Sequence, residues 1–182
     1  MIFEEKEVIL KNGKAAILKT AEIADAEKML NFIKQASGET DFLSRYPEER
    51  TSTIEQEEDW IRNFRESESV LNITCFVDGE IAGNCDVRFP GGIKTSHRAV
   101  IGIAVLKDYW NLGIGFLMLP ELINAAKNHG SELLELECFG DNKRAQHLYE
   151  KFGFCAVAVK PKAYKLKDGT YQDEIYMQKE LT

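Results

Sequence analysis

The sequence contains the stretch Arg98-Ala-Val-Ile-Gly-Ile-Ala-Val-Leu-Lys-Asp-Tyr-Trp-Asn-Leu-Gly-Ile-Gly-Phe116. Its first half, residues 98–106, is almost entirely apolar, which predicts a central strand covered on both faces. A helical pattern follows over residues 113–128 and stops at Gly130, a residue suited to a C-cap. The turn between them should present free backbone N–H groups at the positive end of the helix dipole. Glycine lets an anion approach such groups closely, so the turn is suited to a pyrophosphate, although glycines that only ease a tight turn would look the same.

A second motif follows the predicted strand at residues 133–138 and reads Asp141-Asn-Lys-Arg-Ala-Gln-His-Leu-Tyr-Glu-Lys-Phe-Gly-Phe154. Asn142 is suited to the N-cap of a helix over residues 142–151. Ala145 and Tyr149 are four residues apart, so they share one face of that helix. If this face borders the glycine turn, the small side chain leaves room for a ligand and the phenol is presented to it. Otherwise Tyr149 is a half-buried core residue with a solvated hydroxyl.

The rest of the sequence predicts a mixed α and β protein with a single domain over residues 1–182. Helices are expected at residues 25–35 and 53–66, and strands at residues 14–19, 70–77 and 81–89. A final hairpin is expected from residues 154–166 and 171–181. Because a helix separates the strands at 98–106 and 133–138, those two strands should run parallel.

Composition excludes several classes of function. The chain carries 23 Lys and Arg against 30 Asp and Glu, a formal net charge of −7, which argues against binding to nucleic acid or to anionic lipid. No apolar run approaches the roughly 18 residues of a membrane span, and the acidic N-terminus lacks the apolar stretch of a signal peptide. Four cysteines, at positions 75, 85, 138 and 155, show no metal-ligand spacing and lie in apolar stretches, which predicts buried thiols. We therefore expect a cytoplasmic protein without a metal site.

Taken together, the two motifs resemble the GNAT superfamily of N-acetyltransferases. The likeness is specific over residues 99–154, is looser before residue 70, and includes the closing Asp168-Gly-Thr-Tyr-x-Asp-x-x-x-Met177. It implies an α+β, GNAT-like fold with a central mixed, mostly antiparallel sheet of about seven strands, a splayed parallel pair and about four flanking helices. It also implies acetyl-CoA as co-substrate, and similar proteins are often homodimers.

The resemblance also implies roles for single residues. The exposed backbone of Ile103, Ala104 and Val105 would pair with the pantetheine arm as an added strand does. The other side of the cofactor would contact Asn142 and Ala145. Tyr149 falls where the family often has the acid that protonates the departing thiolate. The pyrophosphate would be received by the N–H groups of Asn111, Leu112, Gly113, Ile114, Gly115 and Phe116.

Two positions depart from the family pattern. Trp110 stands where the turn usually begins with Arg or Gln, so one polar contact with the cofactor should be lost. Val100 stands where many relatives carry a glutamate base. Asp86 and His97 are the alternatives that the sequence offers, and each could equally be an ordinary surface carboxylate or a strand-edge imidazole.

The acceptor site is expected in residues 37–58, with help from the final hairpin. The segment of residues 37–59 holds eight acidic residues against Arg45 and Arg50. It is therefore either a solvated acidic face or an anionic funnel for a cationic amine. The leading function is transfer of an acetyl group from acetyl-CoA to the primary amine of a small molecule by direct attack on the thioester. A non-catalytic acyl-CoA-binding regulatory module and a protein N-terminal acetyltransferase are the alternatives.

Overall fold

The computed structural model describes residues 1–181, which form eight strands, four α-helices and three short 3-10 helices. The helices are α1 (Ala26–Glu39), α2 (Ile54–Glu66), α3 (Ile114–His129) and α4 (Lys143–Lys151). The strands are β1 (Lys6–Ile9), β2 (Ala15–Lys19), β3 (Val70–Val77), β4 (Glu80–Arg88), β5 (Arg98–Val105), β6 (Leu133–Phe139), β7 (Cys155–Lys165) and β8 (Tyr171–Glu180).

All the strands belong to one sheet in the order β1-β2-β3-β4-β5-β6-β8-β7. Every neighbouring pair is antiparallel except β5 and β6, so the expected mixed sheet with one parallel pair is confirmed. The expected count of about seven strands is one too low, because β1 was not anticipated. This strand pairs with β2 through a tight turn in which Gly13 has a φ of +84°. The Asn12-Gly13 pair between two apolar runs is the hairpin signal that marks it.

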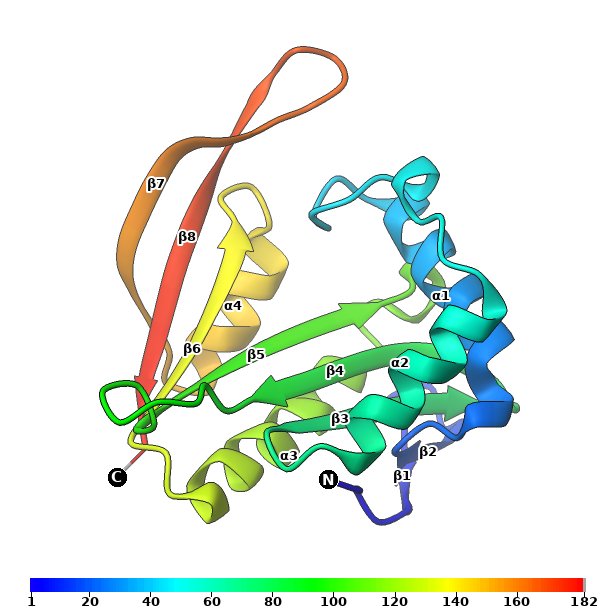
Figure 1. Ribbon diagram of the computed structural model, residues 1–182. Coiled ribbons are helices and arrows are strands. Elements are labelled where there is room, and N and C mark those ends of the chain that lie inside the picture. The colour runs from blue at the N-terminus through cyan, green and yellow to red at the C-terminus, as the bar shows by residue number, and fades with distance from the viewer. Residues whose placement is uncertain (182) are drawn as a thin grey trace.

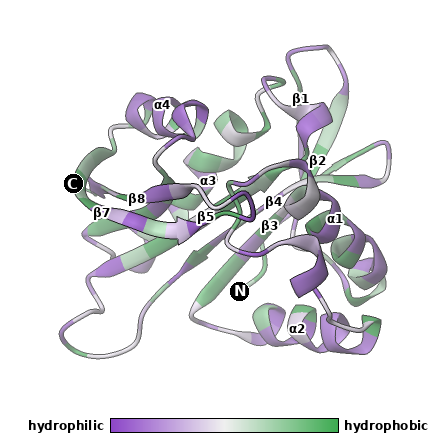
Figure 2. Ribbon diagram, turned by 90° about the horizontal axis from the view of Figure 1, so that it is seen from above, coloured by the Kyte–Doolittle hydropathy of each residue, from purple (hydrophilic) through white to green (hydrophobic). Residues whose placement is uncertain are grey.

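Helices cover both faces of the central strands, as Figure 1 shows. On one face, α3 contributes Met118, Leu119 and Leu122 to a core that includes Ile73 and Leu134. On the other face, α1 and α2 pack over the sheet in a second, smaller core. The hydrophobic colouring of the central strands and α3 in Figure 2 reflects this double burial, whereas α4 is mostly hydrophilic. The apolar run of β5 is thus explained by cover on both sides.

The parallel strands β5 and β6 diverge along their length, and the space between them positions the site. β5 and β6 pair only where Arg98, Ala99 and Val100 lie beside Leu133, Leu134 and Glu135. An ion pair from Arg98 Nε to Glu135 at 2.8 Å closes the narrow end. Beyond it the two strands diverge (Figure 1), so within the described sheet the β6-facing edge of residues 101–105 has no strand beside it.

The cysteines are all free, and the expectation that they are buried is only partly correct. Cys75, Cys85 and Cys138 are buried, but Cys155 is exposed. It begins β7, the edge strand of the sheet, where residues 155–162 are exposed on both faces because nothing covers them. Among residues 1–181, no helix is long and apolar enough to cross a membrane.

Candidate active site

The turn between β5 and α3 forms a cradle of backbone N–H groups. Asn111 and Gly113 both have a positive φ, +65° and +95°, and Gly113 is the N-cap of α3. The first helical bond of α3 runs from Leu117 N to Gly113 O at 3.0 Å, so the N–H groups before Leu117 have no acceptor within the helix. Leu112 differs, because its N–H donates to Tyr109 O at 3.4 Å. The turn can therefore offer several donors to one anion, but the structure does not support the expected contribution of Leu112.

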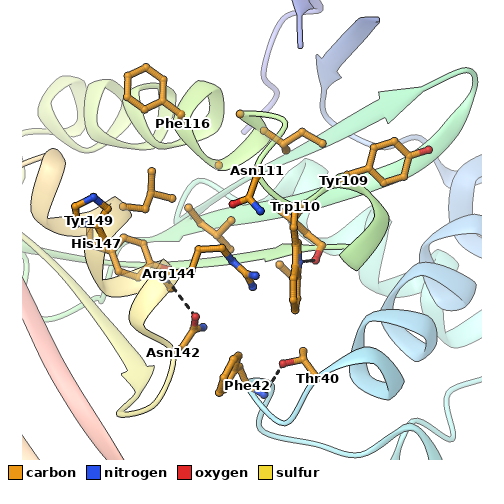
Figure 3. Close-up of a pocket in the computed structure, with 18 of the residues that line it drawn as sticks. Thr40, Phe42, Tyr109, Trp110, Asn111, Phe116, Asn142, Arg144, His147 and Tyr149 are labelled. Atoms are coloured by element: carbon orange, nitrogen blue, oxygen red, sulfur yellow. Dashed lines mark hydrogen bonds between the residues drawn. The ribbon is translucent and has the colours of Figure 1, made fainter. Parts of the chain in front are cut away.

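A cavity of about 270 Å³ lies against this cradle and is called the narrow cavity below. Figure 3 shows the turn residues on one side and Asn142, Arg144, His147 and Tyr149 of the α4 region on the other. Every predicted cofactor-binding residue except Leu112 lines it, namely Ile103, Ala104, Val105, Asn111, Gly113, Ile114, Gly115, Phe116, Asn142, Ala145 and Tyr149. The two motifs are thus brought together as the sequence indicated.

Close packing and capping hold the two walls of the narrow cavity in place. Asn142 Oδ1 accepts a hydrogen bond from Ala145 N at 3.2 Å, which confirms Asn142 as the N-cap of α4. A Cβ on Gly115 would lie 2.9 Å from Leu148 Cδ2, so glycine at this position allows α4 to approach α3. The close approach of the two walls therefore depends on glycine at position 115.

The charge of the narrow cavity is opposite to that of the whole chain. Its lining includes Lys11, Arg144, His147 and Lys151, and no Asp or Glu among the described residues. Together with the N–H cradle, these side chains make the cavity suited to an anionic ligand. A net charge of −7 for the whole chain is therefore compatible with an anionic ligand in this cavity.

Trp110 has contacts that the sequence did not reveal. Its Nε1 donates to Val105 O at 2.8 Å, which ties the turn to the last residue of β5. The Arg144 guanidinium lies over its ring, 3.3 Å from the centroid. Trp110 thus replaces a polar side chain with a bridge that joins β5 to α4 across the narrow cavity (Figure 3).

Tyr149 lies where the narrow cavity meets a second one. It is 7% exposed and lines both cavities. Its hydroxyl makes no hydrogen bond with another group in residues 1–181. Burial raises the pKa of Tyr149 above its usual range, so the phenol stays protonated near neutral pH. It is therefore a hydrogen-bond donor available to a ligand.

The second cavity, called the wide cavity below, measures about 930 Å³. It lies among α1, α2, the loop of residues 40–53 and the sheet, and Tyr164 of β7 contributes to its wall. Asn84, Asp86 and Arg88 alternate along β4 and line its floor. Ile103, Ala104, Asn142 and Tyr149 belong to both cavities, so the two meet at the unpaired edge of β5.

Asp86 is the carboxylate of the β4 floor. A Cβ on Gly102, its partner on β5, would lie 3.1 Å from Asp86 Oδ1, so the carboxylate lies directly over that glycine. Burial raises the pKa of Asp86, and the Arg88 Nε at 2.9 Å from Oδ2 opposes this shift. His97 lines neither cavity, and its carbonyl accepts the N–H groups of Glu132 and Leu133. Val100 lines the wide cavity but has no polar group, so of the two candidate bases only Asp86 has access to the site.

The acidic segment does not form a continuous anionic funnel. Of its eight acids, only Glu49 and Glu57 line the wide cavity, and both arginines of the segment, Arg45 and Arg50, line it as well. Other acids in the segment have partners elsewhere: Glu39 accepts the N–H of Lys107 at 2.6 Å, Glu48 pairs with Lys167, and Asp59 pairs with Arg62. The wide cavity thus carries mixed charge.

A strap of side chains joins the 40–53 loop to the turn of the β7–β8 hairpin. The N–H of Lys167 donates to the Tyr46 hydroxyl at 3.1 Å, and its ammonium lies 4.2 Å from the centroid of the Tyr46 ring. The same ammonium pairs with Glu48. This contact links two elements that are far apart in the sequence, and both elements contribute residues to the wide cavity.

Comparisons with known proteins agree on one family. A family model described as the acetyltransferase (GNAT) family matches residues 35–154. The L-amino acid N-acetyltransferase AaaT of Escherichia coli is 28% identical over 119 residues, which cover 65% of this chain and 73% of that protein. A ribosomal protein bS18-alanine N-acetyltransferase of Escherichia coli is 29% identical over 112 residues, covering 62% of this chain and 72% of that protein.

Solved structures show the same fold. A GNAT-family acetyltransferase from Streptococcus pneumoniae superposes with a TM-score of 0.85 at 28% identity, covering 92% of this chain and 99% of that one. The yncA protein of Salmonella typhimurium, a putative acetyltransferase solved with its cofactor acetyl-CoA, has a TM-score of 0.78 at 18% identity and covers 91% of this chain and 93% of that one. Among residues 1–181, no group of three or more His, Cys, Asp or Glu side chains could hold a metal ion.

Proposed function

The chain belongs to the GNAT family of acetyltransferases and is an N-acetyltransferase, and on this premise we propose that it transfers an acetyl group from acetyl-CoA to the primary amine of a small molecule. The observation that carries the proposal is the junction of the two cavities at Tyr149 and the unpaired edge of β5. A donor in the narrow cavity and an acceptor in the wide cavity would meet there without either leaving its own site. Proximity of this kind is a large part of what an acyltransferase must supply.

The residues of the narrow cavity fit an acyl-CoA. The N–H groups of Asn111, Gly113, Ile114, Gly115 and Phe116 would hold the pyrophosphate, with Lys11, Arg144 and Lys151 adding positive charge. The free edge of Ile103, Ala104 and Val105 would pair with the amide groups of the pantetheine arm. Asn142 and Ala145 would line the opposite wall. When bound, acetyl-CoA supplies the activated acetyl thioester.

The chain's own groups would then handle the protons. An alkyl ammonium with a pKa near 10.4 must lose a proton before its nitrogen can attack. Asp86 accepts that proton, directly or through water, because its carboxylate lies beside β5 at the floor of the wide cavity. As the new C–N bond forms and the C–S bond breaks, the Tyr149 hydroxyl donates to the sulfur and supplies its proton. The second proton lost by the nitrogen restores the Tyr149 hydroxyl through water, and the proton held by Asp86 leaves to solvent.

A small acceptor is favoured over a protein by the strap, which links two elements that line the wide cavity. The contacts of Lys167 with Tyr46 and Glu48 link the loop to the hairpin, whereas an acetylated protein N-terminus would need an open groove. The protein N-terminal acetyltransferase remains the second candidate because relatives carry that activity. A peptide that begins with alanine and a set of small amines, compared at equal concentration, will separate the two.

The variant Tyr149→Phe tests the proposal. We expect it to lower kcat about 100-fold while the KM for acetyl-CoA stays nearly constant, because only the hydrogen bond to the leaving sulfur is lost. Release of free thiol measures both parameters. Tyr171→Phe is the matched control, because Tyr171 is exposed and lines neither cavity.

Two results would contradict parts of this proposal. Unchanged turnover in Tyr149→Phe rejects the acid role. Binding of acetyl-CoA without thiol release, across amines and peptides, rejects the enzyme and supports an acyl-CoA-binding module instead.

A further inference from the structure

The wide cavity contains two arginines that form no direct ion pair within residues 1–181. Arg45 and Arg50 both line it, and neither forms an ion pair with a carboxylate among residues 1–181. This is unexpected in a segment with eight acids, where oppositely charged partners are abundant. We propose that Arg45 and Arg50 bind an anionic group of the acceptor, so that the acceptor is an amino acid or a similar small amine that also carries a carboxylate. The inference rests on the function proposed above.

Arg50 is already oriented toward such a ligand. Its Nε donates to Ser37 Oγ at 3.3 Å, and Ser37 is buried at the end of α1. The remaining guanidinium N–H groups make no hydrogen bond with residues 1–181. A guanidinium held through Nε can offer its terminal nitrogens as a pair, which is the geometry that suits a carboxylate.

The electrostatic environment of Arg50 also favours an anion. Burial lowers the pKa of Arg50, and the nearby charge of Arg45 lowers it further. Glu49 and Glu57 oppose this shift, but Glu49 already accepts the N–H of Tyr46 at 2.7 Å. Burial raises the pKa of Glu57, and the charge of Arg50 opposes this shift. A ligand carboxylate between the two arginines would relieve their mutual repulsion.

Two acidic side chains of the sheet line the same cavity, and one of them, Asp86, pairs with Arg88. Asp86 lies on the sheet floor over Gly102, and Glu137 of β6 lines the same cavity. An amine would be attracted to these carboxylates, which belong to β4 and β6, the strands on either side of β5. A molecule with an amine and a carboxylate matches both kinds of charge in the cavity, whereas a polyamine would leave Arg45 and Arg50 without an anionic partner.

The test compares matched acceptors that differ only in the carboxylate. Each of the common amino acids is assayed beside its amide and its decarboxylated amine, together with an alanine-first peptide amide. We expect kcat/KM for the preferred amino acid to exceed that of its amide by about tenfold or more, because a charge-assisted hydrogen-bonded pair is lost. The peptide amide should behave like the neutral amides.

The variants Arg45→Met, Arg50→Met and the double variant assign this preference to the two arginines. We expect each to raise the KM for the amino acid, and the double variant to bring the ratio of acid to amide close to one. The KM for acetyl-CoA should stay unchanged in all three variants. Arg62→Met is the control, because Arg62 pairs with Asp59 and lines neither cavity.

Each outcome tests one of three statements: the anionic acceptor, the role of the two arginines, or the proposed function. Equal use of acid and amide by the wild type overturns the anionic acceptor while leaving the acetyltransferase standing. A loss that is equal for acid and amide in the double variant, or that appears in the KM for acetyl-CoA, overturns the role of the arginines. If no amine in the panel is acetylated, the proposed function itself fails.

Discussion

The carboxylate of Asp86 occupies space that Gly102 leaves open on the neighbouring strand. A Cβ at position 102 would approach Asp86 Oδ1 to 3.1 Å, so the two residues depend on each other. Arg88 holds Oδ2 at 2.9 Å, and Glu137 from β6 and Glu57 from α2 line the same cavity. A carboxylate fixed in this way can act as the base where Val100 cannot.

Asp86 should therefore govern the acid side of the pH profile. Burial raises the pKa of Asp86 above the roughly 3.9 of a free aspartate, and a base works only when ionised. We expect kcat/KM to rise with pH as Asp86 loses its proton, at a higher pH than an exposed aspartate would give. The Asp86→Asn variant should lose about 100-fold in kcat and lack this rise, keeping only the dependence set by the acceptor amine.

The control for this measurement is Asp78→Asn, on the exposed turn between β3 and β4. It should keep both the rate and the pH profile of the wild type. A profile in Asp86→Asn that is lower but unchanged in shape would show that Asp86 supports the structure rather than accepting a proton.

Single residues were predictable from the sequence where their neighbours are local. Asn142, Ala145 and Tyr149 share one short helix, so spacing alone indicated the N-cap and the common face. The relation between Asp86 and Gly102 is different, because it depends on the register of two strands that are joined through the loop of residues 89–97. No sequence motif around either residue indicates that pairing.

At the scale of elements, the start of α3 performs most of the binding chemistry that we propose. Gly113 has a φ of +95°, and it turns the chain so that the first N–H groups of the helix face the narrow cavity. An alanine there would be strained by about 1–2 kcal/mol and would tend to shift these donors. We expect Gly113→Ala to raise the KM for acetyl-CoA more than it lowers kcat, and to lower the free energy of unfolding.

The other end of the same helix offers a matched control. Gly130 is the C-cap of α3, has a φ of +85° and would meet no atom within 4 Å if it carried a Cβ. Gly130→Ala should therefore cost similar stability in a denaturant titration without changing the KM for acetyl-CoA. Equal KM values in the two variants would reject the cradle as the pyrophosphate site.

Elements with strong local signals were predicted well, and a short one was missed. The expected strands at residues 70–77 and 81–89 and the expected helix at 53–66 match β3, β4 and α2, and in the structure a capping box of Thr53 with Gln56 begins α2. β1 has only four residues and an exposed pattern, so hydrophobic periodicity could not identify it. Its existence depends on pairing with β2, which is a tertiary contact.

For the whole molecule, net charge says little about the charge of each cavity. The basic lining of the narrow cavity comes from Lys11, Arg144 and Lys151, which lie far apart in the sequence. The acidic segment left both a solvated acidic face and an anionic funnel open, and in the structure only two of its acids line the wide cavity, together with Arg45 and Arg50. The cofactor side of the site could thus be inferred from motifs, whereas the acceptor side required the arrangement in space.

The strap between the 40–53 loop and the β7–β8 hairpin can be tested by substitution and by salt, because its ion pair is exposed. Lys167 and Glu48 are both more than half exposed, so their ion pair is weak and is screened by salt. If the strap restrains the acceptor, Lys167→Met should raise the KM for the acceptor by about two- to fivefold and leave the KM for acetyl-CoA unchanged. High salt should shift the wild type in the same direction and have less effect on the variant.

Lys14→Met is the control for the strap, because Lys14 forms a comparable exposed ion pair with Asp78 at 2.7 Å and lines neither cavity. It should keep the acceptor KM and its salt dependence. Because the Tyr46 hydroxyl accepts the backbone N–H of Lys167, Tyr46→Phe removes a part of the strap that salt does not screen. An acceptor KM that is the same in wild type, Lys167→Met and Tyr46→Phe would mean that the loop and hairpin hold their positions without the strap. The wide cavity would then be open enough for larger acceptors, including peptide N-termini.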